Sequence, residues 1–130
     1  MDVLNPMLDV PPDAPNFEVY YSSACAPCRL EMPVVLRLAE DDTARVVIVL
    51  LGDAQRALAE LAAISETLPG LTRSAGEHDV RTALKAAGND RGILPYSRAI
   101  TRTGRTCAAW SGVLSLDRAR RMLAACMGAS

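Results

Sequence analysis

The order of apolar and polar positions along the chain predicts strands that alternate with helices. Residues 45–51 form a run rich in β-branched side chains, which is typical of a strand buried on both faces of a parallel or mixed sheet. A shorter β-prone run at residues 17–21 predicts a second strand. Residues 97–101 and 106–110 predict two more, and the Arg-Thr-Gly-Arg segment between them indicates a hairpin turn.

Apolar residues at helical spacing occupy the stretches between these strands. Asp53 and Ser115 each precede such a stretch and are expected to cap its helix, because a short polar side chain can accept the unpaired N–H groups of a first turn. Pro33 lacks a backbone N–H and predicts a kink in the first helix. Four helices are expected, over residues 29–40, 54–68, 77–87 and 116–126.

The length is enough for one domain with its own core and too short for two, at 130 residues. Residues 1–16 contain four prolines and are expected to form an extended arm, and residues 17–130 the folded domain. The longest uninterrupted apolar stretch, residues 46–51, is far shorter than the roughly 20 residues that span a bilayer. We therefore expect no membrane span.

The formal net charge of −1 argues against a dedicated nucleic-acid binder and against a polybasic membrane patch. Charge is nevertheless uneven, because residues 1–60 sum to −6 and residues 61–130 to +5. Either the basic half steers a charged protein partner, or the two halves are differently solvated faces of one domain. Residues 1–13 have no basic residue and no apolar core, so they do not resemble a signal peptide. The protein is then cytoplasmic, or its leader precedes this sequence.

Two of the four cysteines form the motif Cys25-Ala26-Pro27-Cys28, directly after the first predicted strand and at the start of a helix. Unpaired N–H groups and the helix dipole stabilise a thiolate at such a position, so Cys25 is expected to be the exposed nucleophile. Cys28 lies one turn deeper and is expected to resolve the mixed disulfide of thiol–disulfide exchange. A structural zinc site is not expected, because the chain has one histidine, His78, and no second close cysteine pair.

The other two cysteines stand alone in the sequence. Cys126 continues the apolar stripe of the last predicted helix and Cys107 lies in the last predicted strand, so both are interpreted first as small core residues. The alternative is a structural disulfide between them, if the compartment is oxidising. Trp110, the only tryptophan, is expected to pack in the core or at the end of the hairpin, and His78 to be solvated.

The segment that begins at Cys25 reads Cys-Ala-Pro-Cys-Arg-Leu-Glu-Met-Pro and resembles the C-x-P-C-R-x-E-x-P active-site helix of TlpA-like thiol–disulfide oxidoreductases. Residues 92–97, Gly-Ile-Leu-Pro-Tyr-Ser, resemble the cis-proline loop of that family, and residues 102–105 its following hairpin. The resemblance extends over nearly the whole chain from Phe17 onward. Together with the predicted order β-α-β-α-α-β-β-α, it implies an α/β domain with the thioredoxin fold, a central mixed β-sheet with helices on both faces.

This resemblance implies an enzyme that exchanges its cysteine pair with disulfides of protein substrates, most often as a reductant, with no cofactor other than the dithiol. It also implies a cis bond between Leu94 and Pro95, which leaves the backbone before the proline free to pair with an extended peptide. Substrate contacts are expected at Ala26, Pro27, Leu94 and Pro95. The resemblance further implies a periplasmic location, with a cytoplasmic one as the alternative, and an upstream electron donor that the sequence does not identify.

Several positions depart from the patterns of related proteins, and two of them bear on the chemistry of the cysteine pair. Ala24 precedes the first cysteine, where the family usually has tryptophan, and Val19 stands where thioredoxin has a buried acid that assists deprotonation. These departures leave the reduction potential and the set of partners open. An alternative function is a copper-binding or other soft-metal-binding module with Cys25 and Cys28 as ligands, although the sequence offers no obvious third ligand.

Two charged residues fall inside predicted strands of the sheet. Glu18 lies in the first strand, and Arg98 lies in the strand at residues 97–101, three residues after Pro95, where the family has a large apolar residue. An unpaired charge inside a sheet is costly, and in the thioredoxin arrangement these two strands are antiparallel neighbours. We therefore predict an ion pair between Glu18 and Arg98 beneath the cysteine pair. The alternative is that Arg98 reaches solvent and Glu18 meets another donor.

Overall fold

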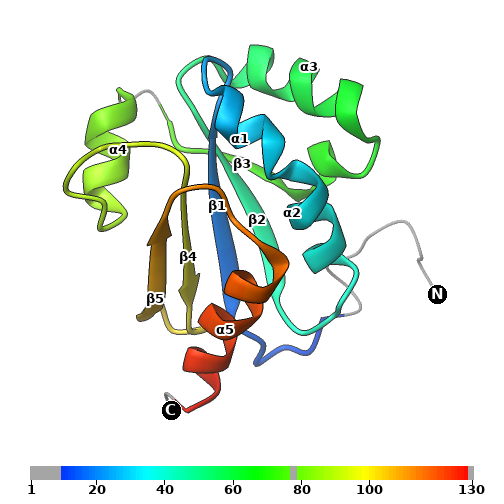
Figure 1. Ribbon diagram of the computed structural model, residues 1–130, viewed down its shortest axis with the longest axis vertical. Coiled ribbons are helices and arrows are strands. Elements are labelled where there is room, and N and C mark those ends of the chain that lie inside the picture. Colours follow the sequence, from blue (N-terminus) through cyan, green and yellow to red (C-terminus); the bar gives the residue numbers. More distant parts are fainter. Residues whose placement is uncertain (1–9, 77–78, 129–130) are drawn as a thin grey trace.

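A computed structural model describes residues 10–76 and 79–128 of the chain. Its centre is a five-stranded mixed sheet in the order β3-β2-β1-β4-β5 (Figure 1). The strands are β1 (Asn16–Ser22), β2 (Arg45–Leu51), β3 (Thr72–Ser74), β4 (Tyr96–Ile100) and β5 (Thr106–Ser111). The helices are α1 (Ala26–Leu30), α2 (Met32–Ala39), α3 (Ala54–Ile64), α4 (Val80–Ala86) and α5 (Leu116–Met127), with a 3-10 helix at Leu68–Leu71. β1 is parallel to β2 and antiparallel to β4.

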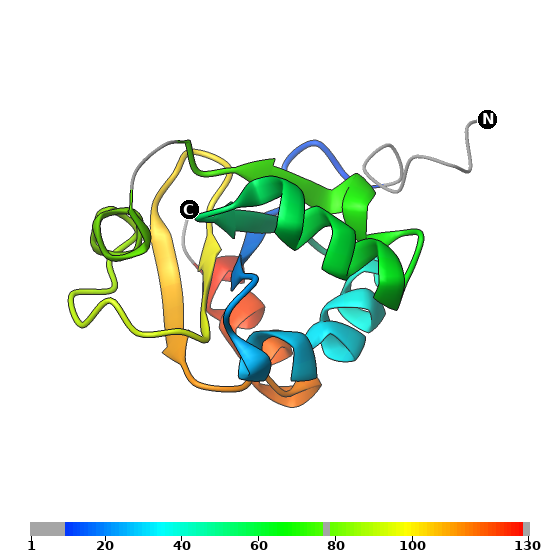
Figure 2. The ribbon, with the colours of Figure 1, turned by 90° about the horizontal axis from the view of Figure 1, so that it is seen from above.

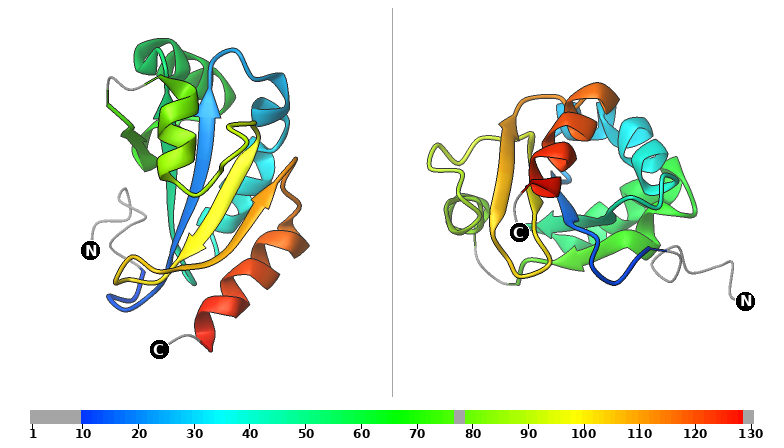
Figure 3. Two further views of the ribbon diagram at one scale, coloured as in Figure 1. Left: turned by 90° about the vertical axis from the view of Figure 1, so that its left-hand side faces the viewer. Right: turned by 90° about the horizontal axis from the view of Figure 1, so that it is seen from below.

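Helices cover both faces of the sheet, but unequally. α2, α3 and α5 lie on one face, whereas α4 lies on the other (Figure 2, Figure 3). Alternation along β1 produces this division, since successive side chains of a strand point to opposite faces. Phe17, Val19 and Tyr21 enter the larger core with the three helices, and Tyr20 joins a smaller core beneath α4. The predicted mixed sheet with helices on both faces is therefore confirmed.

Short polar side chains begin three of the helices. Asp53 and Ser115 accept the backbone N–H of the third residue of α3 and α5, at 3.1 and 3.0 Å, which confirms both predicted N-caps. Asp79 caps α4 in the same way at 2.7 Å, so this helix begins later than the predicted residue 77. Residues 77 and 78 lie outside the described part of the chain.

Three further differences from the prediction concern the first helix, the second helix and the segment after it. The first helix is divided at Glu31, and Pro33 lies in the first turn of α2, where its missing N–H breaks no intrahelical hydrogen bond. The helix expected over residues 54–68 ends at Ile64. Residues 71–76, expected as a loop, contain β3, which pairs in parallel with β2 over three residues. A strand this short has no periodicity of its own, and its partner strand defines it.

The predicted arm is described only in part. Residues 1–9 lie outside the described part of the chain, and β1 begins at Asn16. The division between an arm at residues 1–16 and a domain at residues 17–130 therefore stays a prediction. Within the described residues, no helix combines the length and the apolar character needed to cross a membrane.

Glu18 and Arg98 are direct cross-strand partners in β1 and β4, and their side chains form the predicted ion pair. Arg98 Nε donates to Glu18 Oε1 at 2.8 Å. The Tyr20 hydroxyl donates to the same oxygen at 2.5 Å, and the Arg73 guanidinium donates to Oε2 at 2.8 Å. Burial raises the pKa of Glu18, but the hydrogen bonds from Tyr20 and Arg98 outweigh burial and hold it below its usual value. The carboxylate is thus ionised at neutral pH.

Replacing Arg98 alone leaves the enclosed Glu18 carboxylate with fewer donors. We expect Arg98→Leu to lower the free energy of unfolding by about 2 kcal/mol, less than for an isolated buried pair, because Tyr20 and Arg73 remain in place. The double change Glu18→Leu with Arg98→Leu is expected to recover most of this loss. Urea denaturation of both variants measures the difference, and a double variant less stable than the single one contradicts the expectation.

The two isolated cysteines are bonded to each other. Cys107 of β5 and Cys126 of α5 form a disulfide with their Cα atoms 5.1 Å apart. Their interpretation as separate core residues is therefore wrong, and the alternative is confirmed. Both cysteines contact the larger core, as their apolar surroundings in the sequence indicated, and α5 packs against β5. The bond ties an edge strand to the final helix.

Removing this disulfide releases a constraint on the unfolded chain. The bond joins residues separated by 19 positions, and the double change Cys107→Ser with Cys126→Ser is expected to lower the free energy of unfolding by about 3 kcal/mol. Denaturation of the oxidised double variant against the oxidised wild type measures this loss. A thiol titration confirms that the other cysteine pair is still oxidised in both, and equal stability of the two proteins would contradict the expectation.

Candidate functional site

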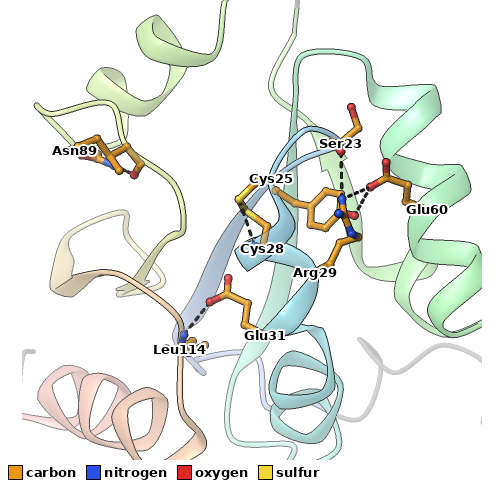
Figure 4. The surroundings of a disulfide bond; sticks show 10 residues. Ser23, Cys25, Cys28, Arg29, Glu31, Glu60, Asn89 and Leu114 are labelled. Carbon is orange, nitrogen blue, oxygen red and sulfur yellow. Dashed lines mark hydrogen bonds and ion pairs between the residues drawn. A yellow bond between two sulfur atoms is a disulfide. The ribbon is translucent and has the colours of Figure 1, made fainter.

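The first cysteine pair lies where β1 ends and α1 begins (Figure 4). Cys25 and Cys28 form a disulfide, and Cys25 occupies the N-cap position of α1. The Sγ atom of Cys25 accepts a hydrogen bond from the backbone N–H of Cys28 at 3.2 Å. The Cys25 N–H donates in turn to the Ser22 carbonyl at 3.0 Å, which fixes the loop to the strand end. The Cys28 N–H therefore already points at the Cys25 sulfur, the atom that would carry the negative charge of the thiolate.

The two sulfurs of this disulfide differ in exposure. Cys28 is fully buried in the larger core, whereas Cys25 is partly exposed. Ala26 and Pro27, which lie between them, are exposed, and Pro27 falls in the first turn of α1, where no N–H is needed. Cys25 is therefore the sulfur that a reactant as large as a protein can reach.

The proline loop has the predicted conformation. The Leu94–Pro95 bond is cis, and Leu94 packs against the same core that Cys25 contacts. Asn89, which is buried, holds the turn before it: its side-chain amide donates to the Ile93 carbonyl at 2.7 Å and its oxygen accepts the Gly92 N–H at 3.2 Å. Sequence reasoning missed Asn89, although an asparagine three residues before a glycine is a turn signal.

Glu31, at the break between α1 and α2, is a second residue that sequence reasoning missed. Its side chain is buried beside the cysteine pair, and its Oε1 accepts the backbone N–H of Leu114 at 2.8 Å (Figure 4). Its Oε2 is buried and has no hydrogen-bond partner. Burial raises the pKa of Glu31 to about 7, against the opposing effect of the Leu114 N–H. Val19 is an apolar core residue, so the acid near the cysteines comes from α1's end and not from β1.

A polar network supports the other side of the cysteine loop (Figure 4). The Tyr21 hydroxyl donates to Glu60 Oε1 of α3 at 2.5 Å, and an Arg29 nitrogen lies 3.5 Å from the same oxygen. The same Arg29 nitrogen donates to the Ser23 carbonyl at 3.3 Å. Burial and the bond to Glu60 raise the pKa of Tyr21 to about 12, so the phenol stays a donor at neutral pH. The network ties α3 to both ends of the loop.

The described residues show no metal centre. Across residues 10–76 and 79–128, no group of three or more histidine, cysteine, aspartate or glutamate side chains is placed to hold a metal ion. The predicted solvated residue His78 lies outside the described part. Ala24, which precedes the cysteine pair, is exposed, so the surface there has no large aromatic side chain.

Solved structures provide a comparison for this fold. The chain is similar to a thioredoxin-related protein from Neisseria meningitidis serogroup B, with a TM-score of 0.72 and 15% identity over 89% of this chain and 87% of that chain. A DsbF homologue from Corynebacterium diphtheriae gives 0.65 at 19% identity, over 86% and 71%. A thiol:disulfide interchange protein from Bacteroides sp. gives 0.65 at 13% identity, over 85% and 71%. No protein-family model and no curated protein matches the chain.

These similarities establish the thioredoxin fold, as the sequence resemblance implied. Fold and site together define a thioredoxin-fold domain with a Cys-x-x-Cys disulfide at the start of its first helix. At this level of identity the likeness shows the fold alone.

Glu31 is expected to give the oxidised protein a specific dependence of stability on pH. Between pH 4.5 and 7 the unfolded chain loses the Glu31 proton while the folded protein keeps it, so the free energy of unfolding falls as pH rises through this window. The loss amounts to about 3 kcal/mol in total. Glu31→Gln is neutral at every pH and removes it. Denaturation of oxidised wild type and variant from pH 4.5 to 7.5 tests this, and equal pH slopes would be the contrary result.

Proposed function

We propose that this protein is a thiol–disulfide oxidoreductase of the TlpA-like type that acts on protein substrates and needs no cofactor beyond its own cysteines. The observation that carries the proposal is the Cys25–Cys28 disulfide at the start of α1, with one sulfur accessible and the other enclosed. A nucleophile in reach of a substrate and a resolving thiol behind it are what disulfide exchange requires. The similar protein from Bacteroides sp. is a thiol:disulfide interchange protein, which supports the same chemistry.

In the reducing direction the reaction begins from the dithiol. The Cys25 thiolate attacks one sulfur of the substrate disulfide, so a bond forms between Cys25 and the substrate while the substrate disulfide breaks. The departing substrate sulfur takes a proton from water. Cys28 then attacks the Cys25 sulfur, which releases the second substrate thiol and forms the Cys25–Cys28 disulfide. Two electrons have passed to the substrate, and a thiol donor upstream must return two to the protein.

Glu31 is the group that we assign as the base for Cys28. Cys28 must lose a proton before it attacks, but it is fully buried and water has little access to it. The Glu31 carboxyl lies beside it (Figure 4), and a pKa of about 7 allows this group both to accept and to release a proton near neutral pH. The proton removed from Cys28 goes to the unpartnered Oε2 of Glu31.

The substrate is proposed to bind across the two loops beside Cys25. The cis bond before Pro95 leaves the Leu94 backbone available to pair with an extended peptide. Exposed Ala26 and Pro27 form the other side of this contact. An apolar substrate segment is favoured, because Ile93 next to this loop is 55% exposed.

We propose that the protein acts as a reductant in the periplasm. The Cys107–Cys126 disulfide supports an oxidising compartment, since structural disulfides persist outside the cytoplasm. A protein that reduces disulfides there depends on an electron donor that restores its dithiol. Its partners are then that donor and proteins with disulfides or thiols, and not nucleic acid, given the net charge of −1.

Cys25 is expected to react first when the protein is reduced. Brief iodoacetamide treatment at pH 7 should label Cys25 at least about tenfold more than Cys28, because only Cys25 is accessible and has a donor at its sulfur. Mass spectrometry of the peptides measures the ratio. Predominant labelling of Cys28 would reverse the two roles.

Variants of each cysteine separate the steps of the reaction. Cys25→Ser should abolish reduction of insulin disulfides, and Cys28→Ser should accumulate the mixed disulfide with the substrate. Cys107→Ser with Cys126→Ser is the matched control, because it removes two cysteines outside the site and should retain turnover. Turnover by the Cys25→Ser protein would refute the mechanism, and loss of activity on addition of a metal chelator would favour the metal-binding alternative.

A further inference from the structure

One peptide group joins the surface of the protein to the buried acid of the site. It lies in the loop between β5 and α5 and consists of the Val113 carbonyl and the Leu114 N–H. On one side the Trp110 indole Nε1 donates to the Val113 oxygen at 3.3 Å. On the other side the Leu114 N–H donates to Glu31 Oε1 at 2.8 Å. Trp110 and Glu31 are therefore linked through a single planar unit.

The Trp110 ring is itself fixed in position. The guanidinium carbon of Arg118 lies 3.9 Å from the ring centroid, a cation–π contact from the first turns of α5. Gly112 lies against the ring, because a Cβ atom at that position would be 3.5 Å from Nε1. Gly112 also has a φ of +130°, which a residue with a side chain rarely adopts. The loop that carries the peptide group is thus shaped around the indole.

We infer that Trp110 is a positioning residue that holds the Leu114 N–H on the Glu31 carboxylate and thereby acts on the thiol chemistry of Cys28. Hydrogen bonds in series polarise one another, so donation to the Val113 oxygen strengthens the N–H of the same peptide as a donor. The effect on the thiols rests on the proposed function. The effect on Glu31 does not, because it depends only on the contacts of the oxidised protein.

The surroundings of Glu31 make the hydrogen bond from the Leu114 N–H the main effect that lowers the pKa of this carboxyl group. Burial raises the pKa of Glu31 to about 7, and the Leu114 N–H opposes that rise; neither Arg29 of α1 nor Arg118 of α5 contributes to it. The two cysteines at the start of α1 are bonded to each other and do not titrate in the oxidised protein. Weakening the hydrogen bond from the Leu114 N–H should therefore raise the pKa of Glu31 further.

The first experiment follows the Glu31 carboxyl carbon by NMR during a pH titration of the oxidised full chain. Trp110→Phe keeps an aromatic ring for Arg118 but removes the N–H donor, and the pKa of Glu31 is expected to rise by about 0.5 to 1. Arg121→Lys is the matched control, because it changes an arginine of the same helix that pairs with Asp117 and has no role in holding the indole. It should leave the Glu31 titration within about 0.2 of wild type. An unchanged titration in Trp110→Phe would overturn the inference.

A wild-type measurement keeps the test valid if Trp110→Phe folds poorly. Trp110 is the only tryptophan, so its fluorescence reports this loop alone. The fluorescence emission of the oxidised protein should change with pH, and the midpoint of this change should equal that of the Glu31 titration. Glu31→Gln should abolish the change. Emission that does not vary between pH 5 and 9 in the wild type would contradict a link between the two residues.

The reduced protein then tests whether the link reaches the thiols. In Cys28 alkylation rates measured against pH on the Cys25→Ser protein, Trp110→Phe should move the profile toward higher pH. In the presence of Glu31→Gln, the same tryptophan change should have no further effect, because the two residues act in series. Additive shifts would show that Trp110 does not act through Glu31. A shifted Glu31 titration without turnover in the wild type would refute the proposed function and leave the positioning role intact.

Discussion

The pairing of β1 along both of its edges is the constraint on which the cysteine site depends. Seven of its residues pair with β2 and five with β4, so β1 cannot shift without breaking two ladders of hydrogen bonds. The loop after it begins at Ser22, whose carbonyl accepts the Cys25 N–H. The reactive Cys25 sulfur therefore lies within one hydrogen-bonded turn of β1, the most restrained strand of the sheet. The network of Tyr21, Arg29 and Glu60 fixes the same loop to α3.

Two enclosed carboxyl groups show how the surroundings assign different roles to one side chain. Glu18 receives donors from Tyr20, Arg73 and Arg98, so it stays ionised and has a structural role in the sheet. Glu31 has one backbone donor and no cation, so its proton is held to neutral pH and can be exchanged. The pKa is lowered at Glu18 and raised at Glu31. This difference distinguishes the acid that stabilises the sheet from the acid that is suited to proton transfer.

Much of the fold could be predicted because its signals are local. The runs at β1 and β2, the caps Asp53 and Ser115 and the hairpin before β5 each depend on a few neighbouring residues. The cis bond before Pro95 and the Glu18–Arg98 pair followed from a resemblance that placed the strands side by side. Both of these predictions needed the topology of the sheet, which the residues alone did not reveal.

The remaining features could not be predicted, because their partners are distant in sequence. Glu31 is enclosed by a loop 83 residues further along the chain, and nothing near it indicates burial. Cys107 and Cys126 needed the packing of α5 on β5 before a bond between them was more than one alternative. The role inferred for Trp110 depends on the orientation of one peptide plane, which no pattern of residue types encodes.

The final helix, α5, is held at both of its ends. At its start, Ser115 caps the first turn and the preceding Leu114 bonds to Glu31; near its end, Cys126 is bonded to Cys107. A helix end ordinarily opens by local fraying, at a free energy well below that of global unfolding. Here fraying from the C-terminal side stops at a covalent bond to the sheet, so α5 joins the cooperative unit of β4 and β5. We therefore expect the amide protons of this helix to exchange with solvent almost as slowly as those of the central strands.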